Sequence, residues 1–231
     1  MPKKHLLSFL PRLFILFFLF SLILNIVFIY GSWKRNVVVR VVDGDSLDLT
    51  DGRRVRLLGI DTPEKGNCMY DQARAHLQKQ ALGKHVRLKN PLKDSYGRLL
   101  ANVIVEDFPS WFFYLNSFPD PDPYLNRGMV VAGLARDTGS NVPSYREVLK
   151  QAEIFAKDRQ LGIWSGECIQ LAPPNPDCQI KGNIRQGVKS YYAPECPNYQ
   201  QVIVNTSYGD NWFCAEDEAT RAGFVKNKAC E

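Results

Sequence analysis

Acidic residues and an arginine lie close together between positions 43 and 64, in a pattern suited to metal-assisted cleavage of a phosphodiester. Asp43 and Asp45 flank Gly44 directly after the β-branched run 36–42, where a strand is expected to end in a turn. Asp61 follows a second apolar run, 54–60. Hard cations such as Ca²⁺ and Mg²⁺ prefer carboxylate, carbonyl and water ligands. The three carboxylates therefore predict an all-oxygen metal site.

An Asp51-Gly52 turn separates these two runs and predicts a hairpin that makes them neighbours. Arg56 then lies near the acids, and a guanidinium beside a metal site is suited to holding phosphate. Any single Asp-Gly pair is more often plain turn chemistry. The combination of the acids with Arg56 favours a catalytic site.

Three segments, 43–46, 56–64 and 94–98, resemble the signature of the staphylococcal (thermonuclease-type) nucleases in order and spacing, and the similarity extends over about residues 37–164. The resemblance implies an α+β fold built on an OB-type five-stranded β-barrel with packed helices. It also implies a Ca²⁺ site, with Mg²⁺ less favoured. Its ligands would be the carboxylates of Asp43, Asp45 and Asp61 and the backbone carbonyl of Thr62.

The same resemblance assigns roles to the other residues of the motif. Glu64 matches the general base, Arg56 and Arg98 match two phosphate-binding arginines, and Tyr96 matches a tyrosine that lies against the nucleotide. The implied reaction is attack of water on DNA or RNA with a 3′-phosphate product. A pair of family tyrosines expected after the second helix is not evident in the run 136–145, which leaves base stacking and substrate preference open.

Two helices are expected around this site. The run 71–82 has helical spacing and is followed by Gly83, a residue typical of helix ends. Ser144 and Glu147 form a capping-box pattern that predicts a helix to about residue 160. The aromatic segment 107–123 resembles an insertion, for which contact with a bilayer, a lid over substrate and packing against the barrel are all open.

Residues 1–33 are expected to be a signal anchor or a cleaved signal peptide. The uncharged run 13–30 has 18 residues, whereas a spanning helix needs about 20 and a signal-peptide core about 7–15. Its length favours an anchor, and in both cases the enzyme is exported, so a membrane contact through this segment is predicted. Without Lys3, Lys4 and Arg12, 26 basic residues face 24 acidic ones, so overall charge says little about nucleic acid.

The remaining chain is divided by composition into a nuclease-like domain at 36–168, a proline-rich linker at 169–176 and a small module at 177–231. About 55 residues form only a small core, so cysteines are expected to stabilise the module. Six cysteines in an exported chain predict three disulfides, with a zinc site as the alternative. Cys68 and Cys168 are expected to pair within or beside the nuclease-like domain. The sequence does not fix the pairing of the other four cysteines, for which the nested pairs Cys178–Cys230 and Cys196–Cys214 are preferred.

Three functional classes follow from these patterns. An exported Ca²⁺-dependent nuclease is favoured because every motif residue is present. A catalytically silent nuclease-like binding module and a cell-envelope interaction protein that acts through its cysteine-containing tail remain as alternatives. The three histidines have no motif around them, which argues against histidine-based hydrolysis. No protein partner is predicted.

Overall fold

The computed structural model describes residues 14–27, 36–106, 124–185 and 187–230. Residues 14–27 are helical, and they are the described part of the predicted N-terminal segment. No helix among the described residues is long and apolar enough to cross a membrane. The aromatic segment 107–123 lies outside the described residues.

A five-stranded sheet forms the centre of the nuclease-like part, in the order β1-β2-β3-β6-β5. Its strands are β1 (Val38–Val41), β2 (Ser46–Leu49), β3 (Arg54–Leu57), β5 (His85–Lys93) and β6 (Leu99–Glu106). Most neighbours are antiparallel, whereas β3 and β6 run parallel. Between the edge strands β1 and β5 there is no continuous ladder among the described residues, but an isolated bridge joins Val37 to His85 and the Val86 N–H donates to the Asn36 carbonyl at 2.9 Å. The expected closed barrel is therefore not formed by continuous ladders among the described residues.

The Asp51-Gly52 turn does form a hairpin, but between different strands from those predicted. It joins β2 to β3, with Ser46 opposite Arg56. The prediction that the runs 36–42 and 54–60 are direct neighbours is wrong, because β2 lies between β1 and β3. Strand β2 has only four residues, Ser, Leu, Asp and Leu, and it begins directly after the acidic turn. Its sequence is therefore interpreted as part of the turn and not as a strand.

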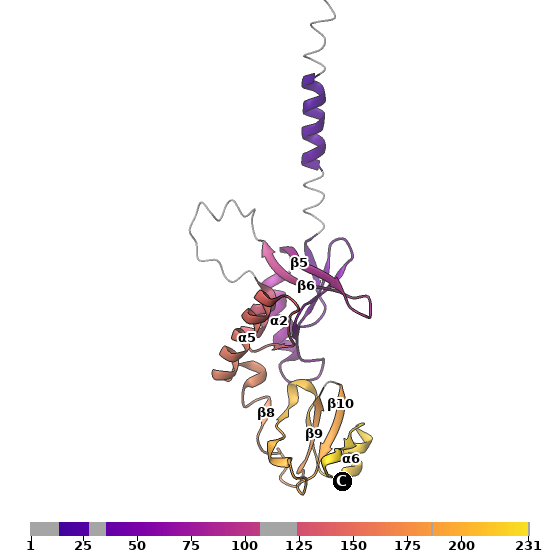
Figure 1. Cartoon of the computed structure of the whole chain (residues 1–231), viewed down its shortest axis with the longest axis vertical. Helices are drawn as coiled ribbons and strands as arrows, with labels where there is room; N and C mark the ends of the chain where they lie inside the picture. The colour runs from indigo at the N-terminus through magenta and orange to yellow at the C-terminus, as the bar shows by residue number, and fades with distance from the viewer. Residues whose placement is uncertain (1–13, 28–35, 107–123, 186, 231) are drawn as a thin grey trace, which may run out of the picture.

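Three helices pack on this sheet (Figure 1). They are α2 (Tyr70–Ala81), α4 (Leu125–Val131) and α5 (Pro143–Asp158). Leu77 of α2, Met129 of α4 and Leu149 of α5 are fully buried with the sheet residues in one core. The helix predicted from Ser144 to about residue 160 is confirmed, but its capping box is wrong, because Val142 is the N-cap and Pro143 opens the helix. Proline suits this first position because its missing N–H would have no helical partner.

The cysteine-containing module has its own four-stranded sheet, ordered β12-β9-β10-β13. Its strands are β9 (Ile180–Arg185), β10 (Val188–Tyr192), β12 (Asn211–Phe213) and β13 (Val225–Lys226), and α6 (Glu216–Arg221) packs beside them. A separate ladder joins β8 (Ile169–Gln170) to β11 (Val204–Asn205). The start of the predicted linker is thus hydrogen-bonded to the module.

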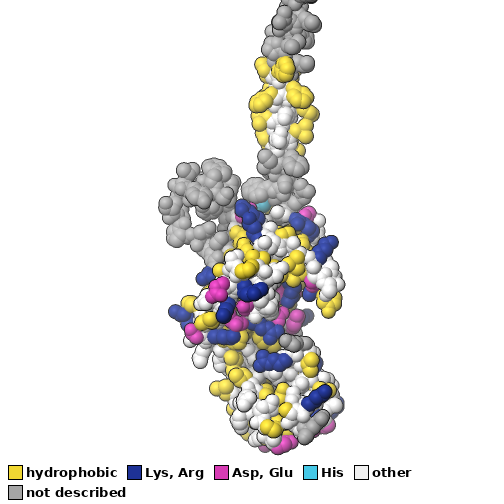
Figure 2. All heavy atoms as spheres, viewed as in Figure 1, with side chains coloured by type: hydrophobic (Ala, Val, Ile, Leu, Met, Phe, Trp, Pro, Cys, Tyr) yellow, Lys and Arg dark blue, Asp and Glu magenta, His cyan; other side chains and the backbone are white. Residues whose placement is uncertain are grey.

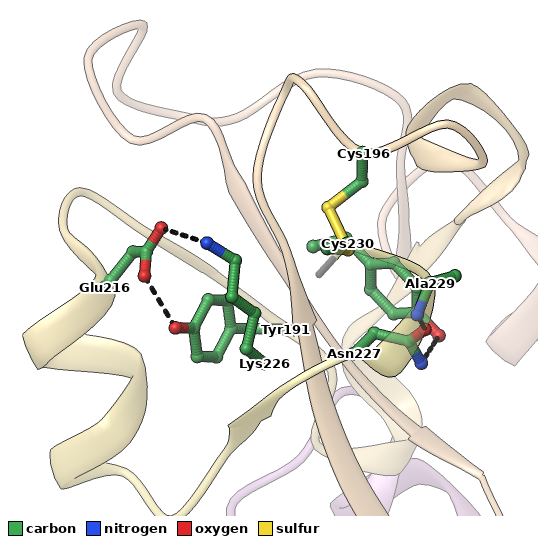
Figure 3. Close-up of a disulfide and its surroundings, with 8 residues drawn as sticks. Tyr191, Cys196, Glu216, Lys226, Asn227, Ala229 and Cys230 are labelled. Carbon is green, nitrogen blue, oxygen red and sulfur yellow. Dashed lines mark hydrogen bonds and ion pairs between the residues drawn. A yellow bond between two sulfur atoms is a disulfide. The ribbon is translucent and has the colours of Figure 1, made fainter.

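All six cysteines are paired, which excludes the zinc alternative. Cys68–Cys168 is confirmed, but the module contains Cys178–Cys214 and Cys196–Cys230 in place of the predicted nested pairs. The physical reason is the sheet: Ile180 of β9 lies opposite Phe213 of β12, and Cys178 and Cys214 lie just beyond this same end of the ladder. Figure 3 shows Cys196–Cys230 near Tyr191 of β10, whose hydroxyl donates to Glu216 at 2.7 Å. Glu216 also binds Lys226 at 3.1 Å.

Candidate nuclease site

The turn between β1 and β2 places the first two acids. Asp45 is 1% exposed, whereas Asp43 is half-buried and accepts the backbone N–H of Asp45 at 3.1 Å. Gly44 between them is required by space: a Cβ atom there would lie 2.8 Å from Thr62 Oγ1 and 2.9 Å from Ala73 Cβ. The glycine lets the acidic turn approach both the Asp61–Thr62 segment and α2.

Arg56 connects two of the predicted carboxylates. Its Nη1 donates to Asp45 Oδ1 at 2.6 Å and its Nη2 donates to Asp61 Oδ1 at 3.0 Å. The β2–β3 register sets this arrangement, since Arg56 lies opposite Ser46, the neighbour of Asp45. The Arg56 side chain is 19% exposed, so the guanidinium is partly shielded from water. A planar guanidinium donates to the two carboxylates from two nitrogens in a fixed fork, a geometry that a lysine ammonium lacks.

Burial raises the pKa of Asp45 to about 7, although Arg56 acts to lower it. The negative charge of Asp43 raises this pKa, the hydrogen bond from Ser46 lowers it, and Asp61 raises it. The negative charges of Asp43 and Asp61 therefore both act on the Asp45 carboxyl. Additional positive charge, from an arginine or from a bound cation, stabilises the ionised form of neighbouring acids.

Asp61 has a second cationic partner that the motif did not reveal. Asp61 lies on β4 (Ile60–Asp61), which pairs with β7 (Arg136–Asp137), so that Asp61 is opposite Arg136. Arg136 Nη2 donates to Asp61 Oδ2 at 2.8 Å. The buried Asn126 of α4 fixes the preceding turn by donating to the Leu58 carbonyl at 2.8 Å. Neither residue carried a local sequence signal, because their partners are far along the chain.

Thr62 and Glu64 follow directly on the chain. Thr62 is buried, whereas Glu64 is exposed. With Asp61 and Arg136, both line a pocket of about 200 Å³. An exposed carboxylate in a pocket that also contains Arg136 is in a position to orient or deprotonate a water molecule.

Arg98 and Tyr96 lie in the turn between β5 and β6. Arg98 Nε donates to Asp94 at 2.7 Å, and its guanidinium lies 5.4 Å from the Tyr96 ring centre. Tyr96 is 83% exposed, which leaves its ring free for stacking on a base. The hydrogen bond to Asp94 is the largest cause that raises the pKa of Arg98, and the negative charge of Asp45 makes a smaller contribution in the same direction. Arg98 thus belongs to the electrostatic surroundings of the acidic turn.

A groove of about 1,040 Å³ joins Arg56 to Arg98. Its lining is rich in cations, contributed by Arg53, Arg54, Arg56, Arg87, Lys93 and Arg98. Figure 2 shows basic and acidic side chains crowded over the nuclease-like part of the molecule. The surface is therefore of mixed charge, and its phosphate-binding potential is concentrated in this groove.

The donor set has the chemistry that Ca²⁺ requires, since carboxylate oxygens and a backbone carbonyl are hard ligands. However, among the described residues no group of three or more acidic, histidine or cysteine side chains is placed closely enough to hold a metal ion. Asp45 and Asp61 instead bind arginines. The candidate metal ligands thus have suitable chemistry, and the negative charges of Asp45 and Asp61 are balanced by arginine side chains.

Comparison with known proteins identifies the family of this chain. Residues 54–166 match the family model described as staphylococcal nuclease homologue. The chain belongs to the staphylococcal nuclease family. It is 36% identical over 142 residues to the thermonuclease of Staphylococcus intermedius, covering 55% of this chain and 74% of that protein.

Two further relatives extend the comparison. Protein ParB of Escherichia coli is 33% identical over 134 residues, which cover 57% of this chain and 72% of that protein. The micrococcal nuclease of Shigella flexneri is 30% identical over 142 residues, covering 57% and 74%. The staphylococcal nuclease family model ends at residue 166, before the β8–β11 ladder. The residues that the module places near the site therefore lie outside the matched family region.

Proposed function

We propose that this protein is an exported, Ca²⁺-dependent nuclease that hydrolyses DNA or RNA phosphodiesters by in-line attack of water. The observation that carries the proposal is the bridging of Asp45 and Asp61 by Arg56, with Glu64 in the adjoining pocket. Membership in the staphylococcal nuclease family supports the same reaction. Disulfides persist in oxidising compartments, so the three pairs support export.

Each protein group has a defined role in this reaction. Glu64 takes a proton from the attacking water as the new bond from oxygen to phosphorus forms. The bond from phosphorus to the 5′-oxygen breaks, and that oxygen receives a proton, which leaves a 3′-phosphate. Arg56 and Arg98 bind the phosphate oxygens as their negative charge redistributes. When bound by Asp43, Asp45, Asp61 and the Thr62 carbonyl, Ca²⁺ would act as a Lewis acid on the phosphate.

The distribution of charge supports a phosphate-binding role for Arg56. In the structure, Arg56 and Arg136 together neutralise Asp61, and Arg56 also neutralises Asp45. A divalent cation at these carboxylates would take over that neutralisation and make guanidinium donors available to phosphate. Tyr96, exposed beside Arg98, would stack on a base of the bound strand.

The test is cleavage of single-stranded DNA, duplex DNA and RNA by the full chain, with Ca²⁺, with Mg²⁺ and with chelator. We expect Ca²⁺-dependent cleavage, and we expect Glu64→Gln to lower kcat by about 10²-fold or more because a positioned general base is lost. The matched control is Glu147→Gln, which changes an exposed α5 glutamate that accepts from Gln151 at 2.8 Å. Oligonucleotide binding should persist in Glu64→Gln.

The second candidate is a silent nuclease-like binding protein, favoured by the arginine pairing of the acids. Its signature would be a folded protein that binds oligonucleotides but cuts none of the three substrates under any metal condition. Equal cleavage by Glu64→Gln and the unmodified protein would instead show a nuclease with a different general base. Membrane attachment through residues 1–33 is proposed separately, and fractionation of cell membranes from soluble protein tests it.

A further inference from the structure

The cysteine-containing module touches the nuclease part beside the catalytic residues. Its 3-10 turn η3 (Thr206–Tyr208) approaches the segment that follows Glu64: the Thr206 carbonyl accepts the Cys68 N–H at 3.4 Å and the Ser207 carbonyl accepts Asn67 Nδ2, also at 3.4 Å. Asn205 Nδ2 donates to the Ile163 carbonyl at 3.0 Å. Both parts of the chain contribute to this junction.

Two stronger connections hold η3 in place. The Cys68–Cys168 disulfide joins the segment after Glu64 to the residue that precedes β8. The β8–β11 ladder then fixes Asn205, the residue before η3, opposite Ile169. A covalent bond and a ladder therefore position η3 against the pocket that contains Glu64.

Tyr208 of η3 stacks on Arg136. The Arg136 guanidinium carbon lies 3.8 Å from the ring centre, and the same guanidinium donates to Asp61 at 2.8 Å. Burial raises the pKa of Tyr208, so the phenol is neutral and offers the face of its ring to the cation. Stacking on the Tyr208 ring restricts the orientation of the Arg136 guanidinium, which is thereby held with its Nη2 toward Asp61.

The pocket of about 200 Å³ is formed jointly by the two parts of the chain. Asp61, Thr62, Glu64 and Arg136 line it from the nuclease part, and Ser207 and Tyr208 line it from the module. A guanidinium carries five N–H donors, and the Asp61 hydrogen bond uses one of them. Arg136 is 35% exposed and can therefore meet a phosphate that enters the pocket.

We infer that Arg136 is a third phosphate-binding arginine and that Tyr208 is its positioning residue, so the module completes the nuclease site. The inference rests on the proposed function, because it concerns the same phosphodiester substrate. It gives the module a role in substrate binding that its balanced charge, with 6 basic and 7 acidic residues from Pro173 onward, would not indicate. A purely structural Arg136–Asp61 contact is the alternative that the test must exclude.

The test measures binding of a fluorescent single-stranded oligothymidylate to the full chain by anisotropy across salt concentrations. It is performed with chelator and, on a Glu64→Gln background, with Ca²⁺, so that the probe stays intact. We expect Arg136→Gln to raise Kd about fivefold to thirtyfold and to reduce the slope of log K against log salt by about 0.7, the contribution of one phosphate contact on a single strand. Tyr208→Leu should change both values in the same direction.

Two controls separate positioning from general damage. Tyr208→Phe keeps the ring and should bind like the unmodified protein. Tyr199→Leu removes a second tyrosine–cation contact of the module, in which Lys181 Nζ lies 4.2 Å from the ring centre, and should leave Kd and the salt slope unchanged. Thermal unfolding of each variant is recorded beside binding, and if Tyr208→Leu does not fold, Arg136→Gln decides the result.

Unchanged Kd and salt slope in folded Arg136→Gln would overturn the inference, and a lowered Tm alone would assign Arg136 a structural role. A lowered salt slope in Arg136→Gln with no effect of Tyr208→Leu would overturn the positioning role of Tyr208. These outcomes can be distinguished from failure of the proposed function, because they measure binding and not cleavage. A protein that binds with the expected salt slopes but never cleaves would refute nuclease activity and retain the Arg136–Tyr208 pair.

Discussion

The guanidinium of Arg56 donates to the carboxylate of Asp45 at 2.6 Å, and that carboxylate belongs to a residue that is 1% exposed. Removing a charged group from water is costly unless it is paired and hydrogen-bonded. Arg56 therefore has a structural role in addition to its proposed catalytic one. It neutralises the buried acid while its second nitrogen binds Asp61 at 3.0 Å.

Replacement of Arg56 by lysine tests both roles. An ammonium cannot present the planar fork that reaches two carboxylates and later a phosphate. We expect Arg56→Lys to lower kcat by about 10²-fold and the free energy of unfolding by about 1–3 kcal/mol, because Asp45 or Asp61 loses a hydrogen bond. Steady-state cleavage and urea unfolding measure these effects.

Arg54→Lys is the matched control for this substitution. Arg54 lies on the same strand, pairs with Asp48 at 2.7 Å and has a side chain that is 53% exposed. Exposed ion pairs contribute little to stability, and lysine keeps the positive charge that Arg54 gives the groove, so this change should leave unfolding and cleavage nearly unaltered. Equal losses in the two variants would show that the fork geometry of Arg56 has no special role.

The local part of the site could be predicted from sequence because its residues are close along the chain. Asp45, Arg56 and Asp61 lie on adjacent short elements, and one hairpin turn brings them together. Helix α2 was predicted within one residue at each end, since its apolar spacing and Gly83 are local signals. Strand β2 could not be predicted in this way, because its four residues follow the acidic turn directly and are too few to give a clear strand pattern.

Features that depend on distant segments could not be predicted in the same way. Arg136 meets Asp61 across 75 positions, and Tyr208 reaches Arg136 from the module. Four cysteines permit three pairings, so composition alone did not select between Cys178–Cys214 and Cys178–Cys230. The β9–β12 ladder selects the first pairing, and that ladder depends on how the whole module folds.

Removal of the Cys68–Cys168 disulfide should destabilise the protein strongly. The bond closes a sequence separation of 100 residues, and it links the nuclease part to the start of β8. In the chain-entropy description, restriction of the unfolded chain by such a loop contributes about 4.7 kcal/mol. We expect Cys68→Ser with Cys168→Ser to lower the free energy of unfolding by about 3–5 kcal/mol, measured by denaturant titration.

The double change of Cys196 and Cys230 to serine is the comparison for this disulfide. Its separation is 34 residues, for which the same description gives about 1 kcal/mol less stabilisation. Loss of this disulfide should therefore lower the free energy of unfolding by less than loss of Cys68–Cys168. Binding of single-stranded DNA should decline only in the Cys68–Cys168 variant, because that bond holds η3 near the pocket. Equal binding by the two double variants would show that η3 is held without the disulfide.

The core of the module depends on a glycine in the centre of its sheet. Gly182 on β9 lies opposite both Tyr191 and Asn211, and a Cβ atom there would lie 2.5 Å from Phe213 Cε2 and 3.0 Å from Phe224 Cε1. The two rings contact each other edge-on, with centres 5.1 Å apart. Added volume at Gly182 must therefore displace packed aromatic rings.

We expect Gly182→Ala to lower the free energy of unfolding by about 1–3 kcal/mol, because overpacking forces side chains out of their preferred rotamers. Gly166→Ala is the matched control, since a Cβ at Gly166 meets no atom within 4 Å. That control should stay within about 0.5 kcal/mol of the unmodified protein. Thermal and urea unfolding compare the two, and a stable Gly182→Ala variant would mean that Phe213 and Phe224 can shift apart at little cost.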